Sequence, residues 1–109
     1  MKMITAIVNK KDTGAVCRAL TDEGFEFTKL ATTGGFLRDG NTTLLIGVAD
    51  EKLQPAIEVI RRNCAQRLQK VPALPPTEMA ATVYHSYPAE VMVGGAIVFV
   101  SDVLHFEKM

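Results

Sequence analysis

The hydrophobic period of this chain alternates between the two-residue period of strands and the roughly 3.6-residue period of helices, in an order that few folds accommodate. Strand-like segments cover residues 2–8, 25–32 and 42–48, and helix-like segments cover residues 14–23 and the stretch that follows Asp50. Further strands are predicted over residues 67–71 and 90–103. The order is β-α-β-β-α-β with an extra C-terminal strand, which predicts an α+β protein with a ferredoxin-like, split βαβ fold.

Each predicted helix has recognisable ends and one apolar face. Asp12 or Thr13 is expected to cap the first helix and Gly24 to end it, while Asp50 is expected to cap the second. Apolar residues recur at helical spacing in both, at Val16, Ala19 and Leu20 in the first and at Leu53, Ile57, Ile60 and Cys64 in the second. Both helices are therefore expected to pack on the sheet through one face.

The predicted sheet has a second face that two helices do not cover. In a chain of this length the economical cover is another copy, so a symmetric oligomer is expected. On the second strand, Phe25 and Phe27 share one face, and Glu26 shares the other with Thr28. Thr28 and Phe99, on the second and last strands, are expected to be neighbours.

The C-terminal half contains one long irregular stretch and one interrupted strand. Residues 72–82 contain three prolines and no regular period, which predicts a long mobile loop. Gly94 and Gly95 interrupt the last strand, and they predict a bulge or a close approach by another backbone or a ligand. Residues 96–100 are almost entirely apolar and are expected to be buried on both faces.

Length and charge exclude several classes of protein. A chain of 109 residues with 48% hydrophobic residues fits a single domain spanning residues 1–109. Twelve basic and twelve acidic residues balance, which disfavours nucleic acid as a partner. The apolar run at residues 4–8 is too short for a signal peptide or a membrane span, so we expect a cytoplasmic protein. Cys17 and Cys64 are expected to be free thiols.

No spacing in the chain indicates catalysis or a metal site. His85 and His105 stand at no distance from a nucleophile that suggests a triad, and we interpret both as ordinary surface or partly packed residues. Metal-ligand spacings such as HxxxH and CxxC do not occur. We therefore expect neither an enzyme nor a cofactor.

The connection from Lys29 to Asn41 carries more polar groups and more glycine than a simple turn requires. Gly34 and Gly35 can expose successive backbone N–H groups to an anion, Phe36 can stack on a base, and Asn41 can donate to and accept from an adenine edge. The same residues also suit a turn with one core anchor. Residue chemistry alone supports two interpretations equally: a nucleotide pocket, and a polar turn with one side chain in the core.

Five segments resemble the PII-like cyclic-di-AMP receptor family. They read TKLATTGGFL at 28–37, GNTTLLIGV at 40–48, NC at 63–64, YP at 87–88 and VGGAIVFV at 93–100. The similarity runs from residue 1 to about residue 106. It implies a PII-like homotrimer that is not an enzyme, binds cyclic di-AMP in the clefts between subunits and signals to an unknown protein target through its loops. On matching positions the ligand-binding residues would be Thr28, Gly35, Phe36, Leu37, Asn41, Gly47 and Phe99.

Two positions depart from the family pattern. Glu26 stands where these receptors commonly have an arginine, and Lys108 stands where they commonly have a glutamine. A carboxylate close to a ligand with two phosphate charges would weaken binding, unless Arg38 or Lys108 offsets it. The resemblance therefore leaves two alternatives: a PII-like trimer that binds ATP or ADP instead, and a protein-interaction trimer with an altered site.

Overall fold

The structure is a computed structural model that describes residues 1–32, 40–65, 67–71 and 89–109. Within these ranges, two helices and six strands follow one another, with a short 3-10 turn before each helix. In order they are β1 (Lys2–Asn9), η1 (Lys10–Asp12), α1 (Thr13–Asp22), β2 (Thr28–Thr32), β3 (Asn41–Val48), η2 (Asp50–Lys52), α2 (Leu53–Cys64), β4 (Arg67–Val71), β5 (Ala89–Val93) and β6 (Ala96–Asp102).

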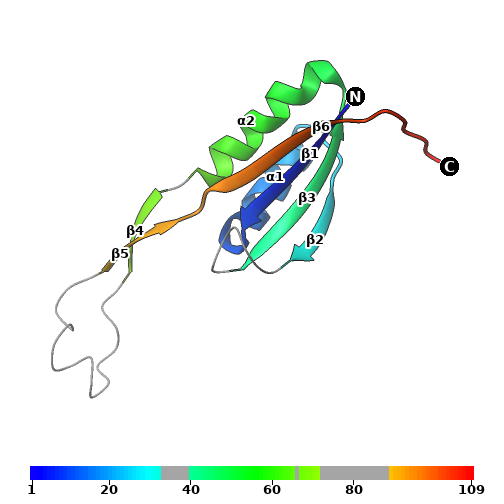
Figure 1. Ribbon diagram of the computed structural model, residues 1–109. Helices are drawn as coiled ribbons and strands as arrows, with labels where there is room; N and C mark the ends of the chain where they lie inside the picture. The colour runs from blue at the N-terminus through cyan, green and yellow to red at the C-terminus, as the bar shows by residue number, and fades with distance from the viewer. Residues whose placement is uncertain (33–39, 66, 72–88) are drawn as a thin grey trace, which may run out of the picture.

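Four of these strands form one antiparallel sheet in the order β2-β3-β1-β6. Both helices lie on one face of this sheet, and its other face carries no helix (Figure 1). Two crossovers by helices and a central β1 are the features of a ferredoxin-like arrangement. The predicted α+β, ferredoxin-like fold is therefore confirmed.

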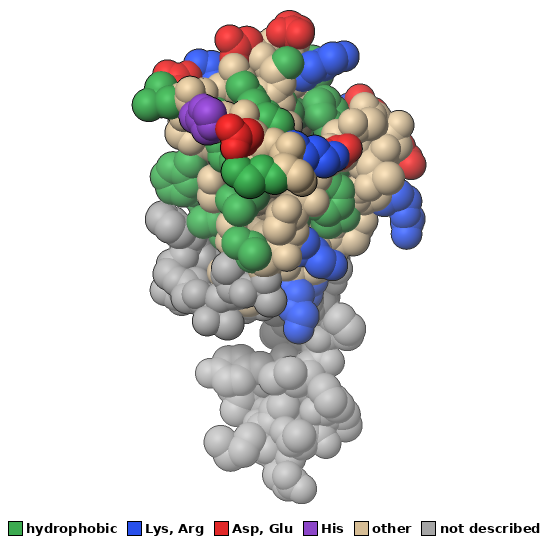
Figure 2. Space-filling view, turned by 90° about the vertical axis from the view of Figure 1, so that its right-hand side faces the viewer, with side chains coloured by type: hydrophobic (Ala, Val, Ile, Leu, Met, Phe, Trp, Pro, Cys, Tyr) green, Lys and Arg blue, Asp and Glu red, His purple; other side chains and the backbone are tan. Residues whose placement is uncertain are grey.

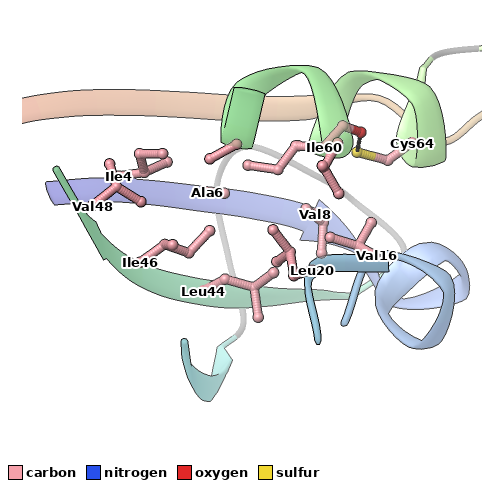
Figure 3. Packing of buried hydrophobic residues seen from close by; sticks show 12 residues of the cluster. Ile4, Ala6, Val8, Val16, Leu20, Leu44, Ile46, Val48, Ile60 and Cys64 are labelled. Atoms are coloured by element: carbon pink, nitrogen blue, oxygen red, sulfur yellow. Dashed lines mark hydrogen bonds between the residues drawn. The ribbon is translucent and has the colours of Figure 1, made fainter. Parts of the chain in front are cut away.

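The core lies between the helices and the covered face of the sheet (Figure 3). It is formed by alternate residues of β1 and β3 and by one face of each helix. The residues are Ile4, Ala6, Val8, Val16, Leu20, Leu44, Ile46, Val48, Ala56, Val59, Ile60 and Cys64. The predicted stripe on α2 is slightly displaced, because Ala56 and Val59 lie at its centre while Leu53 and Ile57 are only partly buried.

The fourth strand of the main sheet is β6, and not residues 67–71 as the order of segments suggested. β4 pairs with β5 in a separate two-stranded sheet. The predicted close approach at the glycines is confirmed, because a Cβ on Gly94 would lie 2.5 Å from Arg67 Nη1 and 3.0 Å from the Ala65 carbonyl oxygen. Gly94 and Gly95 have φ of +80° and +88°, which lets the chain leave one sheet and enter the other.

Neither predicted helix cap is formed by the expected side chain. Asp12 is the N-cap residue of α1, as predicted, but its side chain makes no capping hydrogen bond, and the N-cap residue of α2 is Lys52 in place of Asp50. Asp12 is buried and binds the guanidinium of Arg67, with 2.9 Å between Oδ1 and Nη2. Asp50 binds the Met1 ammonium, also at 2.9 Å. In both cases the carboxylate forms an ion pair in place of a capping hydrogen bond.

Two predictions about the strands are wrong. β2 begins at Thr28, so Glu26 precedes the strand, although Phe25 and Phe27 do pack against the core as their alternation suggested. Burial of residues 96–100 on both faces is contradicted, because Phe99 is 50% exposed and Val100 is 43% exposed. Phe99 lies on the face of the sheet that the two helices do not cover, and β6 is an edge strand with β1 as its one partner in this sheet.

The loop predicted over residues 72–82 lies outside the described residues. Within the described ranges, no helix has both the length and the apolar character that crossing a membrane requires.

Candidate functional site

Four of the residues implicated by the resemblance lie on the face of the sheet that no helix covers. Thr28, Asn41, Gly47 and Phe99 all occupy the strand positions that alternate with the buried core positions. We call this surface the open face. Figure 2 views the molecule from the side toward which the C-terminal residues project, and it shows hydrophobic side chains exposed in several groups. On the open face Leu30 and Phe99 are exposed, as is Thr28, so this face offers both apolar and polar groups to a ligand or a second chain.

Thr28 and Phe99 lie in one row across the sheet but are not neighbours, contrary to the sequence-based expectation. Thr28 pairs with Leu45, Leu45 with Thr5 and Thr5 with Phe99, so three strand spacings separate them. At the usual spacing of adjacent strands this is roughly 14 Å. The two residues mark opposite edges of the sheet.

Asn41 and Gly47 also share the open face and also lie apart. They are the first and seventh residues of β3, which corresponds to roughly 20 Å along an extended strand. Asn41 is 8% exposed and Gly47 is exposed. Gly35, Phe36, Leu37 and Arg38 lie outside the described residues. One copy of the chain therefore spreads the described candidates over the edges and ends of a single face.

The structure brings Glu26 and Gly47 together in one pocket. This pocket has a volume of about 340 Å³ and is also lined by Glu23 and Lys52. Glu23 accepts a hydrogen bond from Arg62 at 2.9 Å, so its charge has a partner. Sequence reasoning missed Lys52, although its place in the polar turn that directly follows the Gly47 strand was a usable signal. Lys52 is thus a cation in the pocket that holds Glu26.

Neither of the other proposed charge partners is placed beside Glu26 by this structure. Lys108 is exposed in the segment beyond β6 and does not line the Glu26 pocket, and Arg38 lies outside the described residues. A larger groove of about 550 Å³ runs between α2 and β6. Its lining contains none of the residues that the resemblance implicates. Size alone therefore does not identify the site.

Met1 holds the Gly47 end of the open face in place. Its ammonium binds Asp50, its carbonyl oxygen accepts a hydrogen bond from Val103 N at 3.1 Å, and its side chain lies over Gly47. A Cβ on Gly47 would come within 3.1 Å of Met1 Cε. The ammonium also holds the pKa of the Asp50 carboxyl below its usual value. Glycine at position 47 is therefore what allows this contact.

The thiols and carboxylates do not form a catalytic or metal centre among the residues described. Burial raises the pKa of the Cys64 thiol to about 11, with a smaller contribution from Asp12, and Cys64 Sγ donates to the Ile60 carbonyl (Figure 3). Such a thiol is a poor nucleophile near neutral pH. Over the described part of the chain, no three His, Cys, Asp or Glu side chains are grouped closely enough to bind a metal ion.

Comparison with known proteins gives two results. The sequence matches the family described as "Cyclic-di-AMP receptor" over residues 1–109. The structure is similar to the crystal structure of a functionally unknown protein from Pediococcus pentosaceus ATCC 25745, with a TM-score of 0.79 and 35% sequence identity. That alignment covers 99% of this chain and 96% of the other. This chain belongs to the cyclic-di-AMP receptor family.

Proposed function

We propose that this protein is a receptor for the second messenger cyclic di-AMP, which it binds in clefts between the subunits of a homotrimer. Family membership supports the ligand. The observation that carries the intersubunit site is the separation of Thr28 and Phe99 at opposite edges of the open face. Two copies that meet at these edges would bring Thr28 of one subunit to Phe99 of the next. Such a cleft would combine Thr28 and Phe99 from two subunits, since these residues are far apart within a single subunit.

Each described candidate has a chemical role in this site. The half-exposed ring of Phe99 would stack on an adenine, and Thr28 and Asn41 would bond to polar edges of the ligand. Gly47 would allow close approach of the ligand to the backbone. Gly35, Phe36 and Leu37 would complete the pocket, as the family resemblance implies. These roles are binding roles, so the protein would act as a receptor and not as an enzyme.

The ligand state would be transmitted to a protein target through the order of the long loop predicted at residues 72–82. Glu26 is the residue that most affects the choice of ligand, because it shares the Gly47 pocket and repels phosphate groups. Lys52 in the same pocket supports cyclic di-AMP as the ligand, because its ammonium can offset that repulsion.

Titration calorimetry of the full chain tests this function. We expect cyclic di-AMP to bind with micromolar or tighter affinity and AMP to produce little heat, while light scattering reports three chains per particle. Tight binding of ATP or ADP in place of cyclic di-AMP would support the adenine-nucleotide alternative. Absence of heat with every nucleotide would support a protein-interaction trimer and would overturn the proposed function.

A further inference from the structure

A third pocket lies on the opposite side of the sheet from the proposed cyclic-di-AMP site. It has a volume of about 370 Å³ and is lined by Lys10, Thr13, Lys29 and Thr42. Four different elements supply these residues: η1, α1, β2 and β3. Lys29 pairs with Leu44, and Thr42 pairs with Val8, so both lie at core-facing positions of their strands. We call this group the lysine pocket.

Three of the four residues make contacts with neighbouring parts of the fold. The Lys10 amide donates to the Gly40 carbonyl at 3.3 Å, which joins η1 to the chain that enters β3. The Thr13 hydroxyl donates to the Asn9 carbonyl at 3.2 Å. The charge of Lys29 acts on Cys17, one turn along α1 from Thr13. The pocket thus lies at the rim of the folded chain, and both of its lysines are exposed.

The lysine pocket has positive charge that the described residues do not neutralise. Throughout the described ranges, no carboxylate forms an ion pair with Lys10 or Lys29. The nearest carboxylate in the sequence, Asp12, is bound to Arg67 at 2.9 Å. A dianion bound between Lys10 and Lys29 would be attracted to both ammonium groups.

Thr42 adds a hydroxyl group to the lysine pocket. The residue is only 9% exposed, and it lines this pocket. Its hydroxyl makes no hydrogen bond with any residue that the structure describes. A hydroxyl that lines a pocket beside two lysines can donate to an oxygen of a bound anion.

We propose that the lysine pocket binds a small molecule through a phosphoryl group, independently of the cyclic-di-AMP site. Lys10 and Lys29 would bind its charged oxygens, and the hydroxyl of Thr42 would donate to one of them. A pocket of about 370 Å³ is larger than a phosphate ion needs and lies within the range of small-molecule sites. The ligand class is therefore a phosphate monoester or diphosphate, and not inorganic phosphate alone.

The test uses the full chain, labelled with nitrogen-15, and two probes that carry no adenine: glycerol 3-phosphate and inorganic pyrophosphate. Both are expected to give saturable shifts of the amide signals of Lys10, Lys29 and Thr42. The variants Lys10→Gln and Lys29→Gln should each weaken binding about fivefold, as should Thr42→Val. Binding should also weaken as salt is added.

Lys11→Gln is the matched control, because Lys11 is an exposed lysine of the same 3-10 turn and does not line the pocket. It should leave the affinity of both probes unchanged. An equal loss in Lys11→Gln would show a general charge effect and would overturn the proposal, as would the absence of saturable shifts with both probes. Loss of cyclic-di-AMP binding in the Lys10 and Lys29 variants would place the pocket within the nucleotide site and would also overturn it.

Discussion

The two faces of the four-stranded sheet come from the same strands and differ in what they do. On the covered face, residues such as Ile4, Leu44 and Ile46 are 0% exposed and pack beneath two helices. On the open face, the Leu30 side chain is 42% exposed and the Phe99 side chain is 50% exposed. One face therefore provides the stability of the fold, and the other is available for a ligand or a second chain. Four predictions examine this division, beginning with the largest expected effect.

Leu44→Ala should destabilise the covered face by about 3 kcal/mol, because it leaves a cavity where a fully buried side chain packed. Chemical denaturation would measure this loss of unfolding free energy. Thr43→Ala is a neighbouring change on the open face and should cost much less. If both substitutions destabilised the chain equally, the two faces would not differ in the way we describe.

The Cys64 thiol should be protected from alkylation by its place in the core. Its pKa is raised from 9.0 to about 11, so at pH 8 the reactive thiolate is about a hundredfold less abundant than without this shift. Iodoacetamide should therefore modify Cys64 far more slowly in the native protein than in urea, and the native rate should rise with pH toward 11. Rapid modification of the native protein at pH 8 would contradict this burial.

Phe99→Ala should affect binding more than folding. Loss of a stacking ring should weaken the affinity for cyclic di-AMP about tenfold or more, as measured by calorimetry. The unfolding free energy should change by only about 1 kcal/mol, because half of the side chain is already in water. A destabilisation as large as that of Leu44→Ala would assign Phe99 to the core.

Charge changes in the Gly47 pocket should alter affinity in opposite directions. Glu26→Gln should strengthen cyclic-di-AMP binding about fivefold, and Lys52→Gln should weaken it by a similar factor. Both effects should shrink at high salt because the two side chains are exposed. Lys11→Gln, which removes a lysine outside this pocket, should have no effect. If both pocket variants had unchanged affinity for cyclic di-AMP, this pocket would not be part of the ligand site.

Much of the fold could be predicted because its signals are local. Helical spacing located Val16 and Leu20 on the buried face of α1, and two-residue alternation located Phe25 and Phe27 against the core. The stretch at residues 90–103 was harder, because one apolar run contains two strands that belong to different sheets. Its glycines marked the break, and the partner of each strand depended on distant parts of the chain.

The candidate site, too, could be predicted only in part from local sequence signals. The family motif pointed to residues on one face, yet it did not show that Thr28 and Phe99 lie at opposite edges of the sheet. Lys52 was missed because its place in the polar turn after the Gly47 strand is only a weak local signal. Its significance depends on a pocket that it shares with Glu26, which is far from it in the sequence.

The sequence by itself determined the order of helices and strands, the two faces of the sheet and membership of the cyclic-di-AMP receptor family. Only the tertiary structure decided which strand completes the sheet and which partner each charged group binds. Asp12 looked like a helix cap, but its carboxylate binds Arg67, which lies 55 residues away. Periodicity and propensity depend on neighbouring residues, whereas strand pairing and ion pairs depend on distances that exist only after the chain has folded.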